Sequence, residues 1–292
     1  MTLILRIKGK INNPNAPKLI EYDPIESKNG SIFLWDAGRQ RLSNIDNGAV
    51  VPNIFEDYAG ALGKSFSIQK GVASENDSYA RVELTGKGAL HFMVSQNYPS
   101  AISGEAFWGV LANADLRQKL YSEISNNPDI YLSFWIRGTR KGQSRSGKFG
   151  PMLSYVRDNA SNFATYMTSK NSKPEVAAGS TSISKLNIGA TENAFLAPNY
   201  HQVNIKSFSY TGITEDSRLF LGSGLFGPWS SEIALNESPS FAVYRIYIED
   251  LKLSGRTFEQ VKAIDDAEFE KAFAIGGRFN GDTWSDPASI LP

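Results

Sequence analysis

Residues 241–253 read Phe-Ala-Val-Tyr-Arg-Ile-Tyr-Ile-Glu-Asp-Leu-Lys-Leu and contain the clearest strand pattern in the chain. Apolar residues alternate along most of this stretch, as expected for a strand with one face in a core. The residues of that face are Ala242, Tyr244, Ile246 and Ile248. Leu251 and Leu253 then fall on the opposite face, and this change of phase predicts a bulge or bend near Glu249 and Asp250.

Shorter segments with the same period recur from about Lys64 onward. Turn formers separate them, and this spacing is typical of an antiparallel two-sheet sandwich. Residues 129–137 are apolar on both faces, which predicts a central strand. The predicted fold class is therefore all-β, an antiparallel two-sheet β-sandwich. The other expected strands lie at residues 79–84, 90–94, 152–156, 163–168, 202–210 and 218–221.

Helix signals are few. Asn113 precedes a run with an apolar residue at every fourth position, which predicts a capped helix there. Thr257 and Gln260 form a capping box that opens a second helix, and Asp265 with Glu268 repeats the signal. These signals predict a short, jointed helical segment after the last long strand.

Residues 1–60 differ from the rest of the chain. Two short strands are expected there, at residues 2–8 and 31–35, with the turn formers of residues 12–17 between them. Strands this short cannot build a core of their own. The predicted organisation is an extended N-terminal arm (1–60), the β-sandwich (61–256), and a short helical segment with a C-terminal tail (257–292).

Charge and composition exclude several classes of protein. Thirty Lys and Arg residues balance thirty Asp and Glu residues, so no global field attracts nucleic acid or an anionic membrane. The absence of cysteine excludes disulfides, Cys-ligated zinc and thiol nucleophiles. The apolar run at residues 3–5 ends at Arg6, too short for a signal peptide, and no later run is long enough to span a membrane. We expect synthesis in the cytoplasm, no nucleic-acid partner and no membrane insertion.

Two regions resemble known structural proteins. Residues 243–251, with Ser-Gly-Arg-Thr-Phe after them at 254–258, are similar to the closing strand and helix entry of concanavalin A-like, laminin-G-like jelly rolls. The longer run to Asp-Thr-Trp at 282–284 resembles sandwich-containing structural proteins of tailed bacteriophages, and Gly-Ala-Val-Val-Pro-Asn-Ile at 48–54 is similar to a segment of the same group. The resemblance covers mainly the last fifty or so residues.

This resemblance implies a non-catalytic virion structural protein of the tail, baseplate or head surface. Its expected partners are other virion proteins in an oligomeric assembly, and the expected location is the virion. The resemblance carries over no catalytic residue. The alternative is a module that binds a host-surface glycan, and a jelly-roll glycoside hydrolase is a third reading.

Aromatic residues in expected loops are the first candidates for contact with a ligand or partner. Phe226 and Trp229 lie in a Gly-Pro loop, and Phe107 and Trp108 precede a helix. Flat rings at loop tips suit sugar stacking or a protein interface. Packing in the core is the alternative for all of them.

A group of cations is the second candidate. Arg137, Arg140, Lys141, Arg145 and Lys148 lie in a stretch otherwise rich in Gly and Ser. Such a hairpin can hold phosphate or an acidic glycan, but it lacks the aromatic residues that stack on bases. We expect a solvated loop or a contact with a neighbouring subunit, with Arg140, Lys141 and Arg145 as contact residues.

Two motifs fit functional patterns without the context that these patterns need. Residues 222–227 match G-x-G-x-x-G, but Pro228 follows where a phosphate-binding helix is required, so a loop between strands is expected. Glu21 and Glu26 fit the E-x-D-x-x-E spacing of jelly-roll glycoside hydrolases, but Pro24 does not fit a central strand. We predict no catalytic residues and no glycosidase activity.

The number of histidines and the spacing of the acidic and amide residues argue against a metal site. His91 and His201 are the only histidines, so a multi-His metal site is excluded and a Ser-His-Asp triad has two candidate bases. Both are expected to be polar residues on a sheet. Oxygen ligands for calcium are present in loops, but their spacing matches no EF-hand, and we expect no metal and no cofactor. These loop residues are Asn44, Asp46, Asn47, Asp282 and Asp286.

Overall fold

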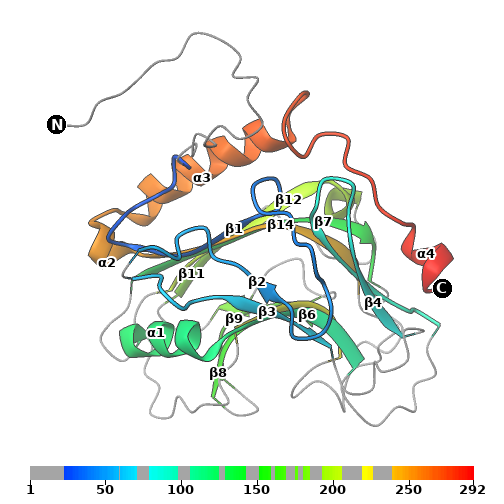
Figure 1. Cartoon of the computed structure of the whole chain (residues 1–292), viewed down its shortest axis with the longest axis horizontal. Coiled ribbons are helices and arrows are strands. Elements are labelled where there is room, and N and C mark those ends of the chain that lie inside the picture. Colours follow the sequence, from blue (N-terminus) through cyan, green and yellow to red (C-terminus); the bar gives the residue numbers. More distant parts are fainter. Residues whose placement is uncertain are drawn as a thin grey trace.

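The computed structural model describes residues 23–58, 60–70, 79–97, 106–124, 129–142, 151–158, 162–168, 175–176, 180–184, 193–205, 219–225 and 239–292. Within these residues the chain is mostly β, with two antiparallel sheets and few helices (Figure 1). The sheets lie face to face around an apolar core. This arrangement agrees with the predicted all-β sandwich.

The first sheet, sheet A, is built around its two longest strands. β7 and β14 pair along their whole lengths, and every residue of β14 is buried. The prediction of a central strand at residues 129–137 is confirmed, because β7 lies between β12 and β14. In order, sheet A contains β11 (Ser180–Ser184), β12 (Pro198–Ile205), β7 (Ile130–Arg140), β14 (Ser240–Asp250), β5 (Leu90–Val94) and β4 (Ala80–Leu84), and β1 (Ser31–Asp36) also pairs with β14.

The second sheet, sheet B, contains the strands expected at residues 152–156, 163–168 and 218–221. Its strand at the third of these positions is longer than predicted and runs to Leu225. The first part of the G-x-G-x-x-G match therefore lies in a strand rather than in the expected loop. In order, sheet B contains β10 (Glu175–Val176), β9 (Asn162–Thr168), β8 (Pro151–Asp158), β13 (Leu219–Leu225), β6 (Ala106–Ala112), β3 (Phe66–Lys70) and β2 (Val50–Val51).

β14 contains a bulge, but not at the predicted place. Val243 and Arg245 lie opposite consecutive residues of β7, which leaves Tyr244 as the extra residue. Tyr244 and Arg245 both face away from sheet B, whereas Ile246 returns to the core. The prediction that Tyr244 and Ile246 share a face is therefore wrong. Near Glu249 and Asp250, where a bulge or bend was predicted, β14 ends and α2 begins at Leu251, and the pairing with β1 shifts register opposite Glu249.

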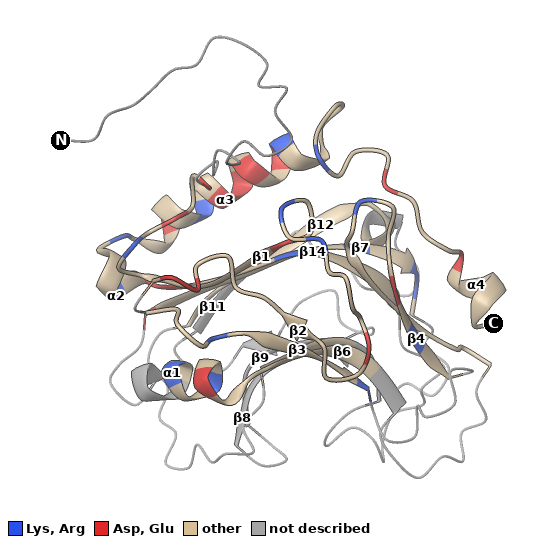
Figure 2. Ribbon diagram, in the orientation of Figure 1, with Lys and Arg blue, Asp and Glu red and all other residues tan. Residues whose placement is uncertain are grey.

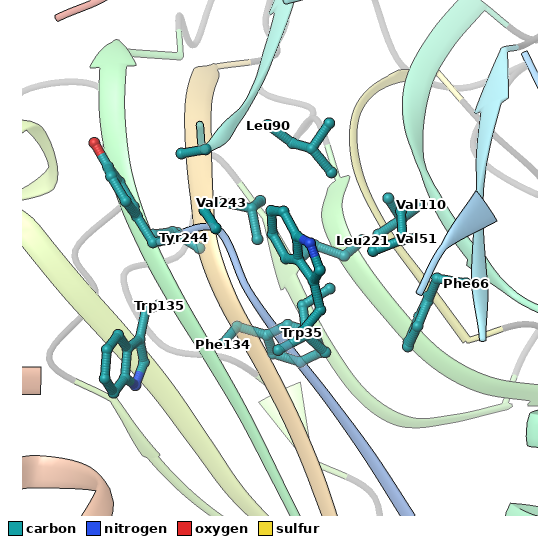
Figure 3. Close-up of a cluster of buried hydrophobic side chains, with 14 of the residues drawn as sticks. Trp35, Val51, Phe66, Leu90, Val110, Phe134, Trp135, Leu221, Val243 and Tyr244 are labelled. Carbon is teal, nitrogen blue, oxygen red and sulfur yellow. The ribbon is translucent and has the colours of Figure 1, made fainter. Parts of the chain in front are cut away.

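The core between the sheets is rich in aromatic side chains (Figure 3). Trp35 from β1, Phe134 from β7 and Val243 from β14 face Leu221 from β13 and Phe66 from β3. Each of these side chains is fully excluded from solvent. Burial of large apolar side chains is the main favourable contribution to the stability of such a sandwich.

Helices connect and cover the sheets. They are α1 (Ala114–Ile124), α2 (Leu251–Ser254), α3 (Phe258–Phe273) and α4 (Pro287–Ile290), with a 3-10 turn, η2, at Asn193–Leu196. The predicted capping box is confirmed, since the side chains of Thr257 and Gln260 each accept the other's backbone N–H. The predicted joint is wrong: α3 is continuous, and Asp265 lies in its interior rather than at a cap.

β1 belongs to sheet A and is not laid over its surface. It pairs antiparallel with β14. Part of its other edge is covered by the side chain of Asn53, which accepts from Leu34 N at 3.0 Å and donates to Ile32 O at 2.8 Å. Covering these groups keeps further strands from pairing there. The strand predicted at residues 2–8 lies outside the described residues.

Candidate functional site

The outer face of sheet A, which is turned away from sheet B, is covered by α3 (Figure 1). Acidic positions follow one another along this helix (Figure 2). Two of them, Asp265 and Glu268, are buried although they are charged residue types. Buried carboxylates are rare unless they are paired, so the contact between α3 and sheet A is the candidate functional site.

The centre of this contact is an ionic group that we call the Arg245 cluster: Arg245, Asp23, Asp36, Asp265 and Arg278. Arg245 donates from two nitrogens to both carboxylate oxygens of Asp23, at 2.7 and 3.0 Å. It also donates to Asp36 at 3.0 Å, and Arg278 reaches the same Asp36 oxygen at 2.8 Å. The Arg245 Nε lies 4.0 Å from the Asp265 carboxylate.

The cluster joins segments that are far apart in the sequence. Asp23 precedes β1, Asp36 ends β1, Arg245 lies in β14, and Asp265 and Arg278 come from α3 and the turn after it. Arg245, Asp23 and Asp36 have almost no exposed side-chain surface. Buried charges are tolerated only when their partners are well placed. The cluster therefore fixes where both the segment before β1 and the helix α3 lie on the sheet.

The indole of Trp135 supports both guanidinium groups of the cluster. The Cζ of Arg245 lies 4.7 Å from the ring centroid, and that of Arg278 lies 5.4 Å from it. The same indole donates from Nε1 to Asp265 at 3.1 Å. A tryptophan face attracts cations, and planar guanidinium groups stack well on it. Trp135 therefore interacts with the charged groups of the cluster in addition to packing among apolar side chains.

Asp265 accepts hydrogen bonds from four side chains of the sheet. Tyr131 Oη lies 2.8 Å and Ser133 Oγ 2.5 Å from one carboxylate oxygen. The amide of Gln202 donates to the same oxygen at 3.0 Å, and Trp135 donates to the other. Hydrogen bonds to an ionised group are stronger than neutral ones. One acidic residue of α3 thus fastens the helix to β7 and β12.

The pKa values of Asp23 and Arg245 agree with an ion pair that stays charged. Burial alone would raise the pKa of Asp23, but the hydrogen bonds and charge of Arg245 hold it below its usual value. Burial would lower the pKa of Arg245, but Asp23 and Asp36 raise it above its usual value. Asp23 and Arg245 therefore both stay ionised near neutral pH, and the arrangement of the cluster serves to hold segments together.

A second buried group continues the same contact toward α2. The hydroxyl of Tyr247 donates to Glu249 at 2.5 Å and contacts Ser31 Oγ at 3.0 Å. Arg256 pairs with Glu249 and donates to the carbonyl oxygen of Ile25 at 2.7 Å. Burial, and then the charge of Glu249, raise the pKa of Tyr247 well above its usual value, so the phenol stays protonated. This group also joins the segment before β1 to the start of the helical region.

Two predicted aromatic contact residues lie in a strand and not at a loop tip. Phe107 and Trp108 are in β6. The Trp108 side chain is buried and donates from Nε1 to the carbonyl oxygen of Ala80 at 2.9 Å. The ammonium of Lys70 lies over the indole, 5.5 Å from the ring centroid. The indole thereby joins sheet B to β4 of sheet A. Phe226 and Trp229 lie outside the described residues.

Of the predicted cationic contact residues, Arg140 makes hydrogen bonds within the chain. Arg140 ends β7 and donates to the carbonyl oxygens of Pro287 at 3.2 Å and Leu291 at 2.7 Å. Burial lowers its pKa to about 10. Lys141 follows the strand directly, and its carbonyl oxygen accepts from the Gln96 side chain. Arg145 lies outside the described residues.

The remaining motifs can be placed only in part. Glu26 accepts a hydrogen bond from Tyr58, while Glu21 lies outside the described residues. Asp282 accepts backbone N–H groups of Lys87 and Thr283. Among the described residues, no group of three or more His, Asp or Glu side chains is arranged to hold a metal ion.

The residues of the Arg245 cluster were missed by sequence reasoning. Arg245 was assigned no role from the sequence, and Asp265 was predicted as a helix cap. One signal was available, since Arg245 lies in the middle of a strand that is apolar on both sides, where an unpaired charge is costly. No sequence signal pointed to Asp23 and Asp36 as its partners.

Comparison of the chain with protein-family models, with curated proteins and with solved structures gave no match. In the described part of the chain, no helix is long and apolar enough to cross a membrane.

We expect the free energy of unfolding to depend on pH because of the two histidines. Burial of the charged form lowers the pKa of His201 from 6.5 to about 3, and burial also lowers that of His91. As the pH falls below 6.5, the unfolded chain therefore binds protons that the folded chain does not. This contribution to the free energy of unfolding is fully present above pH 6.5. It decreases toward pH 3, by up to about 1.4 kcal/mol per pH unit for His201. Urea denaturation at a series of pH values measures this slope.

A matched pair of variants assigns the slope. His201→Gln should flatten the pH dependence between pH 6.5 and 5, where few other side chains titrate, and His91→Gln should keep most of it. Equal slopes for His201→Gln and the unchanged chain would show that His201 takes up its proton without unfolding.

Proposed function

We propose that this chain is a non-catalytic structural protein of a tailed-bacteriophage virion, in the tail, baseplate or head surface. It acts through contacts with other virion proteins in an oligomeric assembly. In this proposal the sandwich is a concanavalin A-like jelly roll. Of the predicted arm (residues 1–60), the part before β1 reaches a neighbouring subunit.

The observation that carries the proposal is the use of the buried charges. Asp23, Asp36 and Asp265 all serve to hold the segment before β1 and the helix α3 on sheet A. Replacing such ion pairs with apolar residues often keeps or raises stability, so one use of retaining them is to enforce a single arrangement. A subunit that presents a surface to neighbours needs that uniqueness more than it needs a reactive group.

The resemblance and the geometry coincide in one part of the chain. Residues 243–284, which resemble the phage proteins, form most of β14, α2, α3 and the turn after α3. They also supply Arg245, Asp265 and Arg278 of the cluster. The residues that carry the resemblance thus form the unit that places a helix over sheet A, and this supports the proposed structural role.

Particle association tests the proposal. An antibody raised against the purified chain is used to follow it through density-gradient purification of particles from a lysate of the phage that encodes it. We expect the chain to co-sediment with intact particles and to remain after a high-salt wash, because buried interfaces depend less on salt than surface charges do. Recovery only in the soluble fraction would overturn the proposal.

A second arm of the same experiment addresses the glycan alternative. The purified chain is titrated with polysaccharide from the host surface, followed by isothermal calorimetry. Under the structural proposal no saturable binding is expected. Saturable binding by a chain that does not associate with particles would favour a glycan-binding module.

A further inference from the structure

The segment of residues 282–292 lies along the rim of sheet A (Figure 1). Donors on the rim make hydrogen bonds to its backbone carbonyl oxygens. Gly86 donates its backbone N–H to Thr283 O at 2.8 Å. Arg140 donates to two carbonyl oxygens farther along, and Ser95 Oγ and Asn97 N both donate to Pro292 O, at 2.6 and 3.2 Å. The donors belong to the β4–β5 hairpin, the residues after β5, and the end of β7.

Side chains fix the register of this segment. Glu83 accepts both the backbone N–H and the hydroxyl of Ser285, each at 2.8 Å. Its carboxylate also contacts His91 Nδ1 at 2.9 Å, and His91 Nε2 lies 2.8 Å from Thr139 Oγ1. The Trp284 ring packs edge-on against His91. The rim is therefore a preformed site for this segment, with Glu83 fixed in place by its own neighbours.

The segment is joined to the rest of the chain through an exposed glycine. Phe279 is buried and Arg278 belongs to the Arg245 cluster, so the chain is anchored up to that point. Gly281 is exposed, has a φ of +66°, and has no atom within 4 Å of the position of an added Cβ. Rotation about Gly281 moves residues 282–292 without disturbing α3 or the cluster.

We propose that the rim site also takes residues 282–292 of a second copy of this chain, so that neighbouring copies exchange this segment in the assembly. The exchange rests on the proposed assembly role. The hydrogen bonds that the segment makes with Gly86, Arg140, Ser95, Asn97 and Glu83 all join it to the sandwich, so a segment from another copy makes the same bonds. Exchange of an identical element costs little, because contacts are conserved and only the connection changes.

Concentration decides between the two arrangements. A short flexible connection gives the chain's own segment an effective concentration in the millimolar range. Dilute chain therefore keeps its own segment, and copies packed side by side in a particle reach the concentration at which exchange competes. The glycine joint is what allows the segment to leave one sandwich and lie on the next.

Crosslinking of full-length single-thiol variants tests the exchange, and the absence of native cysteine makes the result unambiguous. Asn97→Cys and Pro292→Cys change two exposed side chains whose contact is a backbone hydrogen bond, so the contact itself is kept. The two variants are mixed, incubated at up to about 1 mM, diluted and treated with a short bis-maleimide. We expect a covalent heterodimer whose yield rises in proportion to concentration below ~1 mM.

Two controls make the outcome decisive. The double variant in a single chain should crosslink internally, which proves the geometry. Ala267→Cys, on the exposed side of α3, replaces Pro292→Cys in the second control and should give no heterodimer above background. Absence of the heterodimer when the internal crosslink forms, or an equal yield with Ala267→Cys, would overturn the exchange. Because purified chain is used, this failure is distinct from failure to associate with particles.

Discussion

Replacing Arg245 with Met is expected to lower the free energy of unfolding by about 3–5 kcal/mol. The substitution keeps an apolar stem of similar length but leaves Asp23 and Asp36 buried without their main partner. Uncompensated buried charge is among the most destabilising changes known in proteins. Urea denaturation followed by tryptophan fluorescence measures the effect.

The matched control for this prediction is Arg81→Met. Arg81 is exposed on β4, so the same chemical change there should alter stability by no more than about 0.5 kcal/mol. Adding Asp23→Asn to Arg245→Met should restore part of the lost stability, because it removes one of the stranded charges. An Arg245→Met variant as stable as Arg81→Met would show that the cluster contributes nothing to holding the fold.

Asp265→Asn is expected to cost about 1.5–3 kcal/mol, which is the range for a hydrogen bond to a charged group. An amide keeps the volume of the side chain but offers one acceptor oxygen to a site with four donors. Two of these donors, the hydroxyls of Tyr131 and Ser133, can turn to accept from the new amide, which limits the loss. The measurement is again urea denaturation.

Asp266→Asn is the control one residue away. The Asp266 carboxylate is partly exposed and contacts Lys262 and Gln202 at the helix surface. Exposed ion pairs contribute little, so we expect a change below about 1 kcal/mol. Equal losses for the two variants would mean that Asp265 stabilises α3 only as a helical residue and not through its contacts with the sheet.

Local features of the fold were predictable from the sequence. The strands β14 and β7 follow from alternating apolar residues, and the start of α3 follows from Thr257 and Gln260. These signals are carried by residues within one strand or one helical turn, so no knowledge of distant partners is needed. The central position of β7 follows in the same way from apolar residues on both faces.

The partners across the fold were not predictable. Arg245 and Asp23 are 222 positions apart in the chain, and only the folded topology brings them together. The bulge at Tyr244 was missed for the same reason, since it places Arg245 toward α3 to meet those partners. Trp108 was expected in a loop before a helix, whereas it lies in β6 beside Gly109, which leaves room for the Phe220 ring of the neighbouring strand.

Amide hydrogen exchange of α3 tests most directly whether the buried carboxylate holds this helix on the sandwich. In the unchanged chain, the α3 amides should exchange as slowly as those of β14, because both open only in global unfolding. In Asp265→Asn, α3 should exchange faster than β14, and in Asp266→Asn the two should remain alike. Fast exchange of α3 in the unchanged chain, with β14 still protected, would contradict the role assigned to Asp265 and to the Arg245 cluster.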